Sequence, residues 1–282
     1  ADMFKILIKE LIPLKGTDKF LFKLAPYIII ASSVTMLACL PWGRGMQIIN
    51  YNIGIFFILA VSSVGILGIL LAGWASNNKY TLIGAMRSGA QMVSYELSLG
   101  LAIITMVLFA GTMNINEIVM AQDRGWFIFT GHVPAIIACI IYVIAATAET
   151  NRGPFDLPEA EHELTAGYHT EYSGIHFGFF YLAEYLNLFI VSGICSLMFL
   201  GGWMPFHVNG WDGFNEIMNY IPGIVWFLAK AFFISFVIIW FKWTFPRVRI
   251  DQMLAFEWKY LMPIALVNLV VMALCVTNGW HF

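Results

Sequence analysis

Acidic side chains are concentrated in one segment, residues 149–176, which reads ETNRGPFDLPEAEHELTAGYHTEYSGIH. Carboxylates held close together repel one another, so they bind protons more readily and titrate as a group. Glu159 and Glu163 would share one helix face at a spacing of four residues. The segment can therefore hold a variable number of protons and respond to a nearby change of charge. Its acidic residues are Glu149, Asp156, Glu159, Glu161, Glu163 and Glu171, and Arg152 is its one Lys or Arg.

A solvated acidic loop would show much of the same pattern, and this interpretation stays open from the loop alone. Two features favour a loop with a fixed shape. Gly-Pro at 153–154 and Leu-Pro at 157–158 interrupt helices and set bends. The apolar residues Phe155, Leu164 and Tyr168 alternate with the carboxylates, which indicates a loop packed on another surface.

Three carboxylates, Glu96, Glu184 and the Glu149 already named, lie inside or at the ends of long apolar runs. A charge at the centre of a bilayer costs about 2.5–3.5 kcal/mol on insertion scales. We therefore expect each carboxylate to face the interior of a helix bundle or a wet cavity, where it can take up and release protons. The alternatives are a buried hydrogen bond to a neighbouring helix and, for Glu149, a position near the membrane interface.

The composition requires lipid as the main solvent. The 282 residues are 60% hydrophobic and 11% charged, whereas soluble domains carry about 25% charged residues. A membrane-spanning helix needs about 20 mostly apolar residues. The sequence predicts an all-α polytopic transmembrane bundle, with residues 1–282 as one integral membrane domain. Its seven predicted spans are 24–42, 53–74, 93–111, 132–148 (which residues 127–129 would extend), 177–203, 224–241 and 260–277.

The distribution of positive charge predicts the orientation. With seven spans, twelve of the fifteen Lys and Arg residues fall on one side, and Arg44 and Arg124 on the other. Cytoplasmic loops carry the excess of Lys and Arg. We therefore expect the acidic loop and the N-terminal segment to be cytoplasmic. Residues 3–12, MFKILIKELI, predict an amphipathic helix in the membrane interface, or else the end of a further span that starts before Ala1.

Other polar residues give weaker signals. Lys230 lies inside the sixth predicted span, where it is either a member of a proton relay or a side chain that reaches the interface. His162 and His169 can titrate near neutral pH. The four cysteines lie singly in apolar runs and predict neither a disulfide nor a metal site. The net charge of −2 does not favour nucleic acid as a partner.

Several long motifs resemble the family of H-type membrane subunits of NADH:quinone oxidoreductase, respiratory complex I. The resemblance extends over nearly the whole chain. Members of that family usually begin with one more helix and a loop of the type GPNRxGP, so we expect seven of eight helices here. The motifs are ADMFKILIKE at 1–10, ASNNKYTLIGAMRSGAQMVSYE at 75–96, ETNRGPFDLPEAEHELTAGYHTEYSG at 149–174, FGFFYLAEY at 177–185 and PRVRIDQ at 246–252.

The resemblance implies a function that this chain would perform without a redox cofactor of its own. It would form the membrane-side wall of a quinone channel and couple quinone reduction to proton translocation. Quinone would be the substrate, and FMN and iron–sulfur clusters would lie in partner subunits. The partners implied are the hydrophilic quinone-site subunits that carry the terminal iron–sulfur cluster, and antiporter-like and small membrane subunits. The implied location is the bacterial cytoplasmic (inner) membrane.

The resemblance also assigns residues. For proton coupling it implies Glu96, Glu149, Glu184, Asp156, Glu159, Glu161 and Glu163. For the quinone channel it implies Asp2, Arg87, Arg152 and Phe155. Two alternatives remain open. One is a homologous membrane subunit of a ferredoxin- or hydrogenase-linked complex. The other is a stand-alone ion transporter, which commonly carries inverted repeats and broken helices that this sequence does not show.

Overall fold

The structure is a computed structural model that describes residues 5–6, 8–12, 16–156, 167–206, 215, 218 and 220–279. Seven helices in the described part are long and apolar enough to cross a membrane, which confirms the predicted all-α bundle. They are α2 (Lys19–Cys39), α3 (Gly54–Ala75), α4 (Lys79–Ala110), α7 (His132–Glu149), α9 (Gly174–Phe199), α11 (Gly223–Thr244) and the continuous segment Ile250–Thr277, which contains α12 (Ile250–Phe256) and α13 (Met262–Thr277).

Side chains and glycines at the helix ends explain where the helices begin and stop. The Asp18 carboxylate accepts from the backbone N–H of Phe20 at 3.2 Å and begins α2. The Asn78 side chain does the same for Tyr80 at the start of α4. At the other end of α4, Gly111 takes a left-handed conformation with φ 71°. Such N-terminal and C-terminal caps satisfy backbone groups that a helix end leaves unpaired.

Two spans begin ten or more residues before the apolar runs that predict them. α4 begins at Lys79 rather than at residue 93, and the last span begins at Ile250 rather than at 260. Polar and charged residues in these extra turns lower the local hydropathy, although the backbone remains helical. At 32 residues, α4 is about 48 Å long, which exceeds the roughly 30 Å of a hydrocarbon core. The helix is therefore longer than an untilted crossing requires.

The short helices lie between the spans. α5 (Ile115–Met120), η1 (Ala121–Arg124) and α6 (Phe127–Thr130) lie between α4 and α7, and η2 (Gly167–His169) precedes α9. The expectation that residues 127–129 extend the fourth span is wrong. They form α6, and His132 at the start of α7 has a φ of 47°, which redirects the chain.

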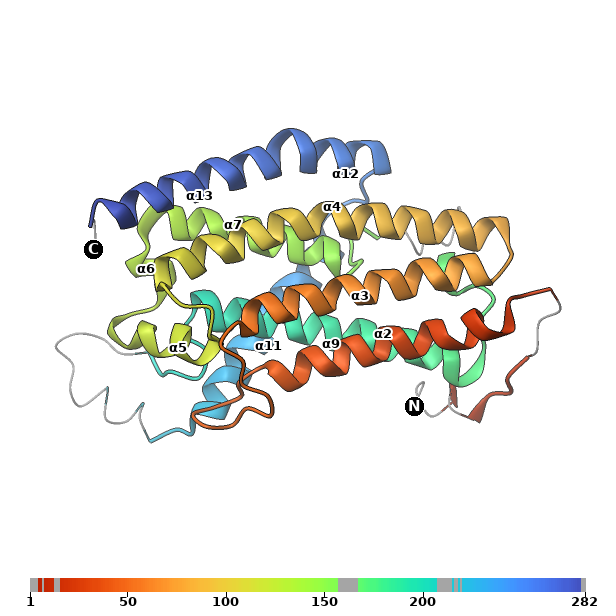
Figure 1. The fold of residues 1–282 in the computed structure, drawn as a ribbon, viewed down its shortest axis with the longest axis horizontal. Helices are drawn as coiled ribbons and strands as arrows, with labels where there is room; N and C mark the ends of the chain where they lie inside the picture. Colours follow the sequence, from red (N-terminus) through yellow and green to blue (C-terminus); the bar gives the residue numbers. More distant parts are fainter. Residues whose placement is uncertain are drawn as a thin grey trace.

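The long helices run roughly side by side, and α4 lies between α13 and α3 (Figure 1). α4 packs against α3, α7 and α13, while α9 packs against α2 and α11. Small residues allow close approach. A Cβ atom added to Gly73 of α3 would lie only 2.2 Å from the Cβ of Ala85 in α4, and one added to Gly84 would meet the backbone of Gly167 and Tyr168 at 3.0 Å.

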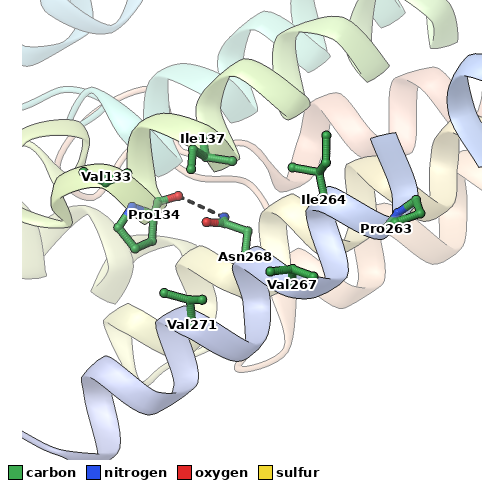
Figure 2. Close-up of a pocket in the computed structure, with 8 residues that line it drawn as sticks. All are labelled: Val133, Pro134, Ile137, Pro263, Ile264, Val267, Asn268 and Val271. Carbon is green, nitrogen blue, oxygen red and sulfur yellow. Dashed lines mark hydrogen bonds between the residues drawn. The ribbon is translucent and has the colours of Figure 1, made fainter. Parts of the chain in front are cut away.

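A groove of about 380 Å³ separates α7 from α13 on the outside of the bundle. Figure 2 shows Asn268 of α13 pointing toward Pro134 of α7, and its amide donates to the Pro134 carbonyl at 3.0 Å. Amide side chains join membrane helices in this way. The remaining residues that line the groove are Val133, Ile137, Pro263, Ile264, Val267 and Val271.

The predicted interfacial helix at 3–12 is described only in part. Lys5, Ile6 and Ile8 are helical, and the backbone N–H of Ile12 donates to the Ser173 hydroxyl at 3.0 Å. This hydrogen bond places the N-terminal segment beside the start of α9. The interfacial position itself stays a prediction.

Candidate functional site

A buried ion pair forms where the acidic loop leaves α7. The guanidinium of Arg152 lies 2.8 Å from the Glu184 carboxylate of α9, and the two side chains are 11% and 15% exposed. The same guanidinium lies over the ring of Tyr185, at 4.9 Å from its centroid. Charges taken out of water need such close partners, because removing one of them leaves the other buried and unpaired.

The loop is held against the end of α11. The backbone N–H of Val248 donates to the Pro154 carbonyl at 3.2 Å, and the Arg247 guanidinium donates to the carbonyl of Asp156. Lys242 and Asp156 both interact electrostatically with Glu184. The basic segment 246–252 therefore packs on the acidic loop. Four charged groups from the loop, α9 and α11 thus gather at one end of the bundle.

Two more carboxylates lie deeper between the helices. Glu96 of α4 accepts from the hydroxyls of Ser62 and Ser63 of α3, at 2.9 and 2.6 Å. Glu149, the last residue of α7, is close enough to Glu96 for their carboxylates to interact. The Oε2 atom of Glu149 is buried and has no hydrogen-bond partner among the described residues. It can therefore bind a water molecule or a proton.

Two small cavities lie beside these residues, each of about 20 Å³ and large enough for about one water molecule. The first is lined by Glu184 and Glu149, and the second by Glu149 and Ser62, the partner of Glu96. Asn187 of α9 lines both. The order along this path is Glu184, Glu149, Glu96, with Glu149 between the two cavities. Water in both would allow a proton to pass along it.

The structure thus brings together five of the residues singled out in the sequence: Arg152, Asp156, Glu184, Glu149 and Glu96. Phe155 is buried, and its ring lies 5.4 Å from that of Tyr95. Arg87 is partly buried on α4. The remaining predicted residues, Asp2, Glu159, Glu161 and Glu163, lie outside the described residues, as do His162, Leu157 and Leu164.

Several polar side chains at the site escaped the sequence analysis. Gln91 is fully buried, and its amide donates to the carbonyls of Ala148 and Phe155 at 2.8 and 2.7 Å, which holds the loop on α4. Glu257 is also buried. It lies within the last span because that span begins ten residues before its apolar run. A polar residue inside or just before an apolar run is the signal that would have identified both.

His169 does not change its own charge near neutral pH. It is 5% exposed and packs edge-on against the ring of Phe177. Burial lowers the pKa of His169 to about 4, because the charged imidazolium would lose its hydration. The expectation that His169 titrates near pH 7 is therefore wrong. Since its folded pKa lies below the unfolded one, this burial costs stability only as the pH falls below about 6.5.

Lys230 binds backbone carbonyls at the end of α9. Its ammonium donates to the carbonyl oxygens of Leu200, Gly202 and Met204 at 2.6, 3.0 and 2.6 Å. It also lies 4.6 Å from the centroid of the Trp126 ring. Carbonyls at a helix C-terminus carry partial negative charge, which a cation stabilises. This geometry favours a structural cap over a member of a proton relay.

Replacing Lys230 by methionine is expected to destabilise the protein by about 2–4 kcal/mol, because three carbonyls lose their donor. Thermal unfolding of the purified complex would measure this, with quinone reductase activity per assembled complex staying near wild type. Lys259→Met is the matched control, since Lys259 is exposed. A stable Lys230→Met protein that has lost activity would restore the relay interpretation.

Comparisons with known proteins agree with these features. Residues 1–273 match a family model described as NADH dehydrogenase. The chain is 64% identical over 282 residues to the H subunit of the NADH-quinone oxidoreductase of Bacteroides thetaiotaomicron, covering all of this chain and 79% of the relative. The protein of the same name from Bacteroides fragilis is 63% identical with the same coverage, and that from Geobacillus kaustophilus is 46% identical, with 80% of the relative covered.

Proposed function

The chain belongs to the NADH dehydrogenase family and is a membrane subunit of an NADH-quinone oxidoreductase. From that premise we propose that it couples quinone reduction to proton movement through Glu184, Glu149 and Glu96. The observation that carries this proposal is the line of three carboxylates beside two water-sized cavities. One end of that line is the buried Arg152–Glu184 pair at the loop.

The geometry supports a stepwise mechanism. Quinone reduction consumes electrons and protons, so it changes the charge beside the loop, where Arg152 and Asp156 lie near Glu184. A shift of Arg152 toward new negative charge would leave Glu184 without its counter-ion. A buried carboxylate without a counter-ion is costly, so Glu184 takes up a proton. Water in the first cavity carries that proton from Glu149 to Glu184. Glu149 is then reprotonated by a proton from Glu96.

The quinone itself would lie on the cytoplasmic side of this pair, against Arg87, Phe155 and the segment that contains Asp2. The chain supplies the wall and the proton path, and the electrons come from partner subunits that carry FMN and iron–sulfur clusters. The hydrophilic partner with the terminal cluster would cover the acidic loop, and antiporter-like and small membrane subunits would pack beside the bundle. The loop residues Glu159, Glu161 and Glu163 would add proton-binding capacity next to the quinone.

The proposed location is the bacterial inner membrane with the acidic loop in the cytoplasm. Its support is that Lys79, Arg152, Lys242 and Arg247 all lie at loop ends on the side that carries most of the Lys and Arg residues. The names of the relatives favour NADH as the electron donor over ferredoxin or hydrogen. They also count against a stand-alone transporter, because each relative is named as a subunit.

Replacing Glu96 by glutamine is expected to lower quinone reductase activity and proton pumping by about tenfold or more. The amide can still accept from Ser62 and Ser63 but cannot exchange a proton. The measurement is quinone reduction and acidification in membrane vesicles, normalised to assembled complex. Glu117→Gln is the matched control, because Glu117 also has a hydroxyl partner, Thr112, but is exposed. Wild-type rates and proton yields in Glu96→Gln would refute the proposal.

A further inference from the structure

Glu257 is a buried carboxylate that the path above does not use. It is 1% exposed and lies where the last span crosses α4. The Ser98 hydroxyl of α4 donates to its Oε1 atom. Its Oε2 atom is buried without a hydrogen-bond partner, and no ion pair joins Glu257 to any residue that the structure describes. It lies on the α12 side of α4, whereas Glu96 contacts α3.

A local widening of the helix places Glu257 there. Residues Glu257–Leu261 form a π-helical turn (η3), in which the N–H of Met262 bonds the Glu257 carbonyl five residues back. Pro263 follows, and it has no N–H to offer the Lys259 carbonyl. Single π-turns inside α-helices are rare and occur frequently at functional sites. The widened turn sets the Glu257 carboxyl group against Ser98.

One face of α4 joins Glu257 to the loop. Gln91, Tyr95 and Ser98 follow at spacings of four and three residues, so they share that face. Gln91 donates to the carbonyl of Ala148 at the end of α7 and to the carbonyl of Phe155 in the loop. The Tyr95 ring packs on that of Phe155, and its hydroxyl donates to the Met253 carbonyl at 3.1 Å, one turn before Glu257. Tyr95 is also the titratable side chain of α4 that interacts with Glu257.

We propose that Glu257 is a further proton-binding site of this protein, and that its proton exchange responds to movement of the loop at 148–155 through Gln91, Tyr95 and Ser98. An isolated charge in such a place would be costly, whereas a neutral acid that carries its proton on Oε2 keeps the hydrogen bond from the Ser98 hydroxyl to Oε1. Movement of Phe155 would shift Tyr95 and so change the surroundings of the carboxyl group. The coupling of Glu257 to quinone reduction rests on the proposed function. The protonation of Glu257 itself is independent of that function.

Infrared spectroscopy of the assembled complex in membranes tests both parts. The carbonyl stretch of a protonated carboxylic acid should be present in the resting wild-type complex, absent in Glu257→Gln and retained in Glu117→Gln. On quinone reduction the same band should shift or lose intensity. Tyr95→Phe keeps the ring on Phe155 but loses the bond to Met253, so it should keep the resting band and reduce its response by about half or more. Glu257→Gln should also lower the proton yield per quinone reduced.

Each possible result of this experiment either supports or overturns the proposal. A resting spectrum that Glu257→Gln leaves unchanged overturns the proposal, whatever Glu96→Gln does. A resting band that does not respond to quinone reduction, with a normal proton yield in Glu257→Gln, shows a structural hydrogen bond only and also overturns it. If Glu257→Gln fails to assemble, Ser98→Ala keeps the carboxyl group and must move the same band; an unmoved band counts against the proposal. Loss of the band with a changed response supports it.

Discussion

Arg152→Ala is expected to reduce quinone reductase activity of the assembled complex by about a hundredfold. The change removes the guanidinium that lies 2.8 Å from Glu184 and leaves that buried carboxylate without its ion-pair partner, so that Lys242 is the positive charge that still interacts with it. Breaking such a pair costs about 3–5 kcal/mol, so Glu184 would become protonated and stay so. It could then no longer take up a proton in response to a charge change at the loop. Arg152→Lys keeps the charge but not the planar fork, and an intermediate activity is expected.

A double-mutant cycle isolates the pair. Combined with Glu184→Gln, Arg152→Ala should cost much less than in the wild-type background, with a coupling energy of about 1–3 kcal/mol. Quinone reduction and the amount of assembled complex are the two measurements. Glu159→Gln and Glu163→Gln serve as comparisons, because neighbouring carboxylates can compensate for one loss. Effects of Arg152→Ala and Glu184→Gln that simply add would show that the two residues act independently.

Glu149→Gln is expected to abolish proton pumping and to slow quinone reduction by about tenfold or more. Glu149 lines both small cavities, so its replacement interrupts the carboxylate line at its middle. Glutamine has nearly the same size and can bind the same water, but it cannot pass a proton on. The amide is also cheaper to bury than a carboxylate, so assembly should be unaffected.

Glu149→Asp provides the matched rescue variant. Its carboxyl group can still exchange protons, and the side chain is shorter by one methylene, so partial pumping is expected. Acidification of vesicles, normalised to quinone reduced, separates pumping from electron transfer. Full pumping in Glu149→Gln would mean that protons take another route. In that case Glu184→Gln should also be tolerated.

The sequence by itself identified the spans and the carboxylates of the proposed path. A hydrocarbon core demands a run of about 20 apolar residues, so each span is visible in a local window of sequence. For the same reason Glu96 and Glu184 stand out, since a charge in such a run is costly wherever its partner lies. The predicted orientation also rests on a local property, the Lys and Arg content of each loop.

Helix ends were harder to predict from sequence. The last span reaches back to Ile250, but Asp251, Glu257 and Lys259 lower the hydropathy of its first turns. The window that identifies a span averages all faces of a helix, whereas only one face of these turns, with Met253 and Glu257, is buried against protein. Glu257 therefore falls before the predicted span 260–277 and was not singled out, although it is among the most buried carboxylates of the described chain.

Only the tertiary structure decided which groups meet. Arg152 forms an ion pair with Glu184 on α9, and Lys230 donates hydrogen bonds to the carbonyl end of α9. The thiols of Cys139 and Cys195, on neighbouring helices, lie within hydrogen-bonding distance. The two cavities beside the carboxylates are likewise bounded by side chains from several helices. A sequence shows that a buried polar group needs a partner, because the cost of burial is local. The identity of the partner depends on how the helices pack.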